Sequence, residues 1–196
     1  MDNADANARF SADQIRDFVI AAHGNLPRVR EMLAEHPGLL NLRHKWAEGD
    51  YETAIQAAAQ VGSAPVAEYL LDRGAPLEIC TAAMLGRKEV VQRMLEENPG
   101  LIEARGAHGI PLMPHVALSN NLELAQMLFE RGATDGMSQA LGNALTHGDA
   151  RMARWILETG EADMHWKNYE GKSLLTIAAE SRKREVVELL REYGAS

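Results

Sequence analysis

The chain has 196 residues, of which 46% are hydrophobic and 24% are charged, and this composition is typical of a globular domain rather than a disordered segment. The net charge of −8 disfavours non-specific binding to nucleic acid, because phosphate groups repel an acidic surface. The single cysteine excludes an internal disulfide and a cysteine-based zinc site, and the uncharged stretches are too short to span a membrane.

Residues 1–12 are predicted to form a tail before the folded region. The segment starts with acidic residues, whereas a secretory signal peptide starts with basic ones, so we expect a cytoplasmic protein. Ser11 is followed by Asp13 and Gln14, a pattern typical of the N-cap of a helix. The first helix is therefore predicted to begin after Ser11.

Six turn positions recur along the rest of the chain. They are Gly24, Gly62, Gly86, Asn120, Gly148 and Arg182. Glycine and asparagine tolerate the left-handed backbone of a tight turn. Apolar residues follow each turn at helical spacing, and a mostly small apolar pair precedes it, from Ile20–Ala21 in the first unit to Ala178–Ala179 in the last. Each unit is therefore predicted to be a helix, a tight turn and a second helix, and the units must stack because neither helix can bury its apolar face alone.

The connections between units alternate between long and short. The longer ones have room for a projecting β-hairpin and contain His44, His108 and His165, whereas units beginning near Ile79 and Met137 lack that room. We expect an all-α solenoid of stacked helix–turn–helix units with short β-hairpin loops. Its units are predicted near residues 13–43, 44–77, 78–105, 106–135, 136–165 and 166–196.

Three segments resemble the ankyrin repeat, whose signature is Gly-x-Thr-Pro-Leu-His-x-Ala-Ala, a Gly turn, an apolar run and a final Gly-Ala. Residues 53–75 contain Thr-Ala-Ile-Gln-Ala-Ala-Ala, then Gly62, then a closing Gly-Ala. Residues 171–195 contain Gly-Lys-Ser-Leu-Leu-Thr-Ile-Ala-Ala, and residues 109–133 begin Gly-Ile-Pro-Leu-Met. The chain thus resembles an ankyrin-repeat protein of bacterial type, with about six repeats over residues 13–196. The resemblance implies a non-catalytic module that binds another protein.

Signals for catalysis or ligand binding are weak. Gly171-Lys172-Ser173 resembles the end of a phosphate-binding loop, but Trp166 stands where that loop requires glycine. No two of the seven histidines have the spacing that places both on one helix face around a metal, and hairpins two units apart are expected to lie roughly 20 Å apart. Cys80 falls in a register that predicts a buried, unreactive thiol. We therefore predict no catalytic residue, no metal and no cofactor.

Several side chains have two open interpretations at this stage. The hairpin aromatics Trp46, Tyr51, Trp166 and Tyr169 either pack against neighbouring hairpins or wait for a partner, since Trp and Tyr are common interface anchors. Met84 and Met113 fall at positions that permit either a buried or an outward side chain.

The predicted function is protein binding on the concave surface formed by hairpin tips and inner helices. Candidate contacts are His44, Trp46, Tyr51, His108, Ile110, Trp166, Lys167 and Tyr169 on hairpins, and Gln60, Met84 and Leu118 on inner helices. The negative charge favours a protein partner with a basic patch, and we expect binding to neither nucleic acid nor a membrane. A monomer fits this function. Alternatives are a self-associating assembly protein and a small-molecule-binding protein or enzyme.

Overall fold

The computed structural model describes residues 9–194 and consists of stacked helix pairs with one small sheet. The first helix of each pair is called inner and the second outer. The pairs are α2 (Ala12–Ala22) with α3 (Leu26–Glu35), α4 (Ala54–Gln60) with α5 (Ala64–Asp72), α6 (Ile79–Met84) with α7 (Lys88–Glu97), α8 (Leu112–Val116) with α9 (Leu122–Glu130), α10 (Met137–His147) with α11 (Ala150–Thr159), and α12 (Leu174–Glu180) with α13 (Arg184–Glu192). The remaining elements are strands β1 (Arg43–Ala47) and β2 (Asp50–Thr53) and the 3-10 helices η1 (Pro37–Leu39), η2 (Pro99–Glu103) and η3 (Ala107–Gly109). The predicted all-α solenoid is confirmed.

The tight turn inside each pair lies at its predicted position. Five of the six turn residues have left-handed backbone with φ between 56° and 73°, and Gly24 has φ 159°. Asn120 and Arg182 are among the five, although a Cβ atom is strained in this conformation. The geometry of the repeat therefore overrides the local preference of an arginine.

The apolar stripes pack as predicted along most of the array. Val29, Ala82 and Leu128 are fully buried. Leu71, Met94 and Phe129 are half-buried, and the exposed exceptions lie at the two ends, where Ile20 is 50% exposed and Ala179 is exposed. Each end pair has a neighbour on one side only, so part of its inner stripe stays in solvent.

The last outer helix, α13, presents a polar face to solvent. Its buried residues are Val186, Leu189 and Leu190, while Val187, which was expected on the stripe, is only half-buried. Arg191, which stands where the other units carry an apolar residue, is exposed. This is the arrangement expected of a terminal repeat, which must leave one side in water.

Hydroxyl side chains cap three inner helices. Ser11 caps α2 and forms a reciprocal capping box with Gln14, as predicted. Thr53 forms the same arrangement with Gln56 at the start of α4. Ser173 caps α12 by accepting from the backbone N–H of residue 176. Thr53 and Ser173 mark where two of the longer connections end, and Ser11 marks the start of the first inner helix.

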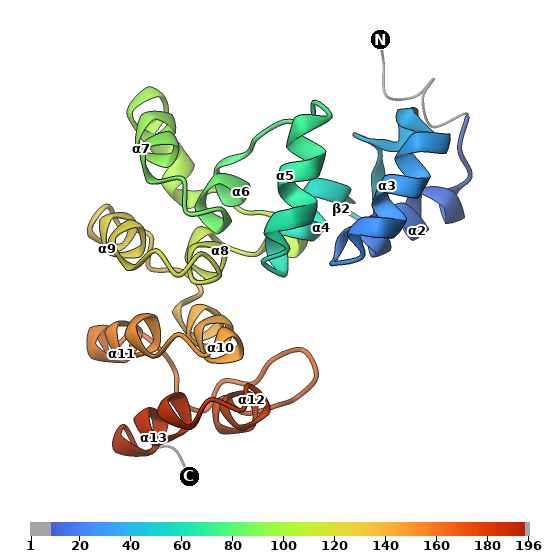
Figure 1. Cartoon of the computed structure of the whole chain (residues 1–196). Coiled ribbons are helices and arrows are strands. Elements are labelled where there is room, and N and C mark those ends of the chain that lie inside the picture. Colours follow the sequence, from blue (N-terminus) through green and yellow to red (C-terminus); the bar gives the residue numbers. More distant parts are fainter. Residues whose placement is uncertain (1–8, 195–196) are drawn as a thin grey trace.

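The buried side chains form two separate clusters. One contains the pairs α2/α3 and α4/α5 together with Met84, and the other contains the rest of α6 and all later pairs. In Figure 1 the three C-terminal pairs stack in a column, and the two N-terminal pairs extend to one side, with the corner at α6 and α7. The array is therefore bent at the α6/α7 pair.

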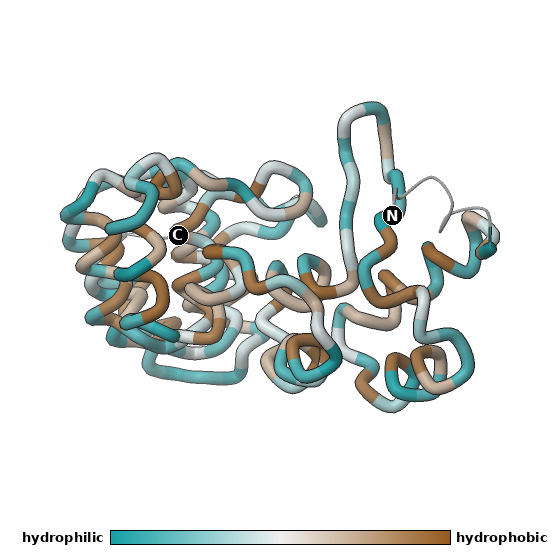
Figure 2. The backbone as a smooth tube through the Cα atoms, turned by 90° about the horizontal axis from the view of Figure 1, so that it is seen from above, coloured by the Kyte–Doolittle hydropathy of each residue, from teal (hydrophilic) through white to brown (hydrophobic). Residues whose placement is uncertain are grey.

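Three loops project from the array, and we call them fingers. Finger 1 (residues 43–53) is the β1–β2 hairpin, in which His44 pairs with Glu52; in Figure 2 it is the tallest projecting loop, largely teal and white, above brown hydrophobic helix segments. Finger 2 (residues 105–111) and finger 3 (residues 167–173) are each closed by one isolated bridge between their end residues. The pairs α6/α7 and α10/α11 begin without a finger, in agreement with their shorter connections.

Fingers 1 and 2 touch each other. The Nδ1 atom of His108 in finger 2 lies 2.8 Å from Oδ2 of Asp50 in finger 1. The expected separation of roughly 20 Å for hairpins two units apart, which assumed evenly spaced helices, is therefore wrong here. The helix between them, α6, has only six residues and carries no finger, so the fingers on either side close over it.

Candidate functional site: an open groove on the concave side

An open groove of about 980 Å³ runs along the concave side of the array. Its lining comes from both sides of the bend, with finger 3 as one wall. The lining residues are His23, Gln60, Val61, His108, Ile110, Leu118, Gln139, Gly142, Asn143, Thr146, His147, Trp166, Lys167, Asn168, Tyr169, Glu170, Lys172, Ile177, Glu180 and Ser181. The bend and the fingers together create a concave surface large enough for side chains of a partner.

The groove contains seven of the eleven predicted contact residues: Gln60, His108, Ile110, Leu118, Trp166, Lys167 and Tyr169. The other three finger residues, His44, Trp46 and Tyr51, lie on finger 1 and do not line the groove. Met84 is only 3% exposed, because its side chain fills the core between α4 and α6. Met84 therefore has no surface to offer a partner, and Met113 is buried as well.

Two aromatic residues, Trp166 just before finger 3 and Tyr169 within it, have different surroundings. Trp166 is half-buried and packs on Gly142 of α10, where an added Cβ would lie 2.8 Å from the ring atom Cζ3. Tyr169, at the finger tip, is 96% exposed. Trp166 thus anchors the finger to the array, while Tyr169 projects free of it.

Finger 1 has two distinct faces. On one face the Trp46 ring meets the His44 ring edge-on at 4.5 Å, and its indole N–H donates to Glu52 at 2.7 Å. On the other face Tyr51 lies near the cationic groups of Arg43 and Lys45, 5.1 and 5.8 Å from its ring centroid. Trp46 also packs against His108 of finger 2, yet Trp46 and Tyr51 remain 39% and 38% exposed. The similar sequences around Trp46 and Trp166 do not adopt similar structures.

Glu52 is a fully buried carboxylate beside the groove, with an exposed fraction of 0%. It accepts hydrogen bonds from the indole of Trp46 and, at 2.7 Å, from the amide of Gln60. One ring nitrogen each of His23 and His108 lies 3.7 Å from its oxygens. Burial raises the pKa of Glu52 above its usual range, although the Trp46 hydrogen bond and the two histidines act in the opposite direction.

The charged groups along the groove are largely paired with one another. The Nζ atom of Lys172 lies 2.8 Å from Glu170 and 2.9 Å from Glu180, and these hydrogen bonds raise the pKa of Lys172 and lower that of Glu170. With Lys167, the lining contains two lysines against two glutamates. The groove is therefore balanced in formal charge, while the chain as a whole carries −8.

Sequence reasoning did not identify Glu52 or Gly142. Glu52 alternates with Asp50 along β2, so strand periodicity could have placed both on the His44 and Trp46 side, but burial arises only when finger 2 covers them. Gly142 lies inside a helix, where a glycine without a turn often indicates a close contact.

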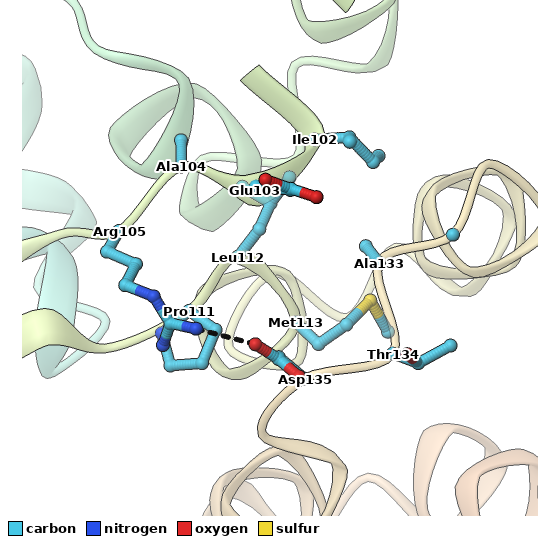
Figure 3. A pocket seen from close by; sticks show the side chains of 11 residues that line it. Ile102, Glu103, Ala104, Arg105, Pro111, Leu112, Met113, Ala133, Thr134 and Asp135 are labelled. Atoms are coloured by element: carbon cyan, nitrogen blue, oxygen red, sulfur yellow. Dashed lines mark hydrogen bonds and ion pairs between the residues drawn. The ribbon is translucent and has the colours of Figure 1, made fainter. Parts of the chain in front are cut away.

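A second pocket of about 430 Å³ lies where the connection from α7 meets the loop after α9. Figure 3 shows Arg105 reaching toward Asp135, with 2.6 Å between nitrogen and oxygen, in a pocket that Pro111, Leu112 and Met113 also line. Arg105 and Asp135 in it already pair with each other, and it has less than half the volume of the groove. The groove is therefore the better candidate for a functional site.

The remaining chemical signals have structural roles. Cys80 is buried as predicted, and burial together with Glu78 raises the pKa of its thiol to about 12. The Gly171-Lys172-Ser173 segment is the turn that leads into α12. Within residues 9–194, no three His, Cys, Asp or Glu side chains are grouped to hold a metal ion, and no helix is long and apolar enough to cross a bilayer.

Comparison with known proteins identifies relatives of this chain. Residues 114–196 match the family model "Ankyrin repeats (3 copies)" and residues 50–82 match "Ankyrin repeat". Ankyrin repeat protein nuc-2 of Neurospora crassa is 25% identical over 187 residues, covering 88% of this chain but 17% of the length of that relative.

Two solved structures share the fold. The human ASB11 ankyrin repeat domain has a TM-score of 0.51 and 22% identity, over 74% of this chain and 69% of that one. A chain from the Bdellovibrio bacteriovorus complex of predatory endopeptidase Bd0816 with immunity protein Bd3460 has a TM-score of 0.50 and 19% identity, over 89% of this chain and 96% of that one. With the helix pairs, left-handed turns and fingers described above, these matches show that the chain belongs to the ankyrin-repeat family.

Proposed function

We propose that this protein is a non-catalytic interaction module that holds a segment of a partner protein in its concave groove. Ankyrin-repeat domains generally mediate protein–protein interaction and are typically not enzymes. The observation that carries the proposal is the groove of about 980 Å³, walled by a finger whose tip tyrosine is 96% exposed. A large aromatic side chain held out of the core beside a concave surface is a typical interface anchor.

The charges suggest how a partner would be recognised. The net charge of −8 acts at long range, so a partner with a basic patch would be steered toward the protein and would bind more slowly at high salt. Inside the groove the charges are balanced, so partly exposed apolar residues such as Val61, Ile110 and Leu118 would supply most of the contact energy. We propose that the protein binds this partner as a monomer and that it does so in the cytoplasm.

The test is the affinity of matched tyrosine variants. Partners are recovered from an extract of the source cells with immobilised wild-type protein, and each recovered partner is then titrated against Tyr169→Ala and Tyr193→Ala. Tyr193 is partly exposed after the last outer helix and is the control. We expect Tyr169→Ala to weaken binding roughly tenfold, the effect of losing an interface anchor, and Tyr193→Ala to bind like wild type. Equal affinity of both variants would place the partner elsewhere.

Self-association is the second candidate. It is favoured by Trp46 and Tyr51, which are 39% and 38% exposed on finger 1 and do not line the groove. Light scattering over a concentration series separates the two functions, because a self-associating chain gains mass with concentration and a monomer does not.

A further inference from the structure

Fingers 1 and 2 belong to pairs that are not neighbours in the array, yet they are joined by a hydrogen bond between His108 and Asp50. In a regular solenoid each repeat contacts only the next one. Here the β2 strand of finger 1 and the η3 turn of finger 2 meet, and α6, the inner helix that separates their pairs, has no finger to hold them apart. The contact is therefore an addition to the repeat rather than part of it.

The polar groups at this contact satisfy one another. His108 donates from Nδ1 to Asp50 at 2.8 Å, and its other ring nitrogen faces Glu52 at 3.7 Å. Gln60 donates to Glu52 and to Nε2 of His23, while His23 donates from Nδ1 to the backbone carbonyl of residue 19 at 3.0 Å. Glu52 keeps Trp46 and Gln60 when the fingers separate, whereas the His108–Asp50 hydrogen bond is made only when they are closed, so that bond favours the closed arrangement.

The Trp46 ring completes the contact. Its centroid lies 6.1 Å from that of His108, and its indole N–H holds the buried oxygen of Glu52 that faces finger 2. We call Trp46, Asp50, Glu52 and His108 the latch. It joins the first and second fingers across the bend.

The packing on the opposite side of the bend is weaker. The hydrophobic core is divided at α6, with only Met84 of that helix in the N-terminal cluster. Between the outer helices α5 and α7 the described link is polar, an ion pair from Arg87 to Glu68, both partly exposed. In Figure 1 these two helices diverge, while α4, α6 and α8 remain close together. A hinge with little apolar packing on its outer side can change its angle.

We propose that the latch holds the array bent at α6 and thereby sets the width of the concave groove, with Asp50, Glu52 and His108 acting as positioning residues. His23, Gln60 and His108 all belong both to this network and to the groove lining. Opening the latch would separate the N-terminal wall of the groove from finger 3. This inference concerns the shape of the free protein and does not depend on what the groove binds.

The test measures a distance across the bend in the full chain. Spin labels are attached to Ile20→Cys and Ala179→Cys, two exposed positions on the inner helices at opposite ends of the array. Cys80 can remain, because its buried thiol will not react. Pulsed electron–electron double resonance then gives the distribution of label-to-label distances in the protein with the intact latch and in the protein with His108→Asn.

His108→Asn removes the imidazole while keeping the turn. His108 and Gly109 both have left-handed backbone, with φ 55° and 69°, and Asn-Gly is a favoured sequence for such a turn. The matched control is His165→Asn, since His165 is exposed near finger 3 and outside the latch. A second variant, Asp50→Ala, removes the other side of the same hydrogen bond.

We expect a single narrow distribution for the intact latch and for His165→Asn. Both His108→Asn and Asp50→Ala should shift the distribution to longer distances and broaden it. Distributions that coincide in all four proteins would overturn the proposal, because the bend would then be set by the inner-helix packing alone. A shift in the His165→Asn control as large as in the latch variants would overturn it as well.

Discussion

His115 is a titratable residue in the core of the array. It is 1% exposed, its Nδ1 donates to the carbonyl of Pro111 at 2.8 Å, and its Nε2 has no hydrogen-bond partner among the described residues. Gly106 passes so close that an added Cβ would lie 2.7 Å from Nε2. Burial lowers the pKa of His115, with the Pro111 bond acting in the opposite direction. The neutral ring is thus part of the folded state.

The pH dependence of stability follows from this residue. The unfolded chain takes up the His115 proton below about pH 6.5, while the folded chain resists it, so the contribution to stability is present above that pH and is lost as the pH falls further. We expect the free energy of unfolding, measured in urea, to fall more between pH 7.5 and 5.5 in wild type than in His115→Asn, which keeps a donor for Pro111 but cannot titrate. Parallel pH profiles would contradict this.

Individual residues show which features the sequence predicts and which depend on how the helix pairs meet. The turns at Asn120 and Arg182 and the buried thiol of Cys80 follow from register, because position within a repeat fixes backbone and burial. The burial of Glu52 and Met84 depends on how two pairs meet at the bend, and no local pattern encodes that.

At the scale of elements, the position of finger 3 depends on one glycine, Gly142. Trp166 rests on Gly142 of α10, and a methyl group there would overlap the ring. Gly142→Ala should cost about 1–3 kcal/mol from overpacking, offset in part by about 0.5–1 kcal/mol from better helix propensity. Because the ring must move, we expect faster tryptic cleavage after Lys167 in the variant than in wild type.

Cleavage after Lys45 in finger 1 is the internal control for that experiment, because finger 1 does not contact Gly142. Unchanged cleavage at both lysines would mean that finger 3 is held by its own turn rather than by the helix beneath it.

The positions of the helix pairs and of the three fingers could be predicted from the sequence, since stripe spacing and connection length determine them. The contact between fingers 1 and 2 could not be. The prediction assumed equal spacing between repeats, whereas α6 has six residues and the array bends there.

Across the whole molecule, stability is shared between neighbouring pairs. Leu128 of α9 is fully buried in the C-terminal cluster, so Leu128→Ala should lower the free energy of unfolding by about 2–5 kcal/mol. Leu122, half-buried in the same helix, is the matched control and should cost less when replaced by alanine. Urea denaturation measures both, and a cost below about 1 kcal/mol for Leu128→Ala would show that the site is not packed as described.

The central claim is that the concave groove, rather than the outer helices, meets the partner protein. The most direct measurement is photo-crosslinking with benzoylphenylalanine placed at Val61 or Tyr169 in the groove, and at Arg93 or Arg151, both exposed on outer helices. In extracts of the source cells we predict a discrete adduct of the same partner from both groove positions and none from the outer positions. The same adduct from the outer positions, with none from Val61 and Tyr169, would contradict the account.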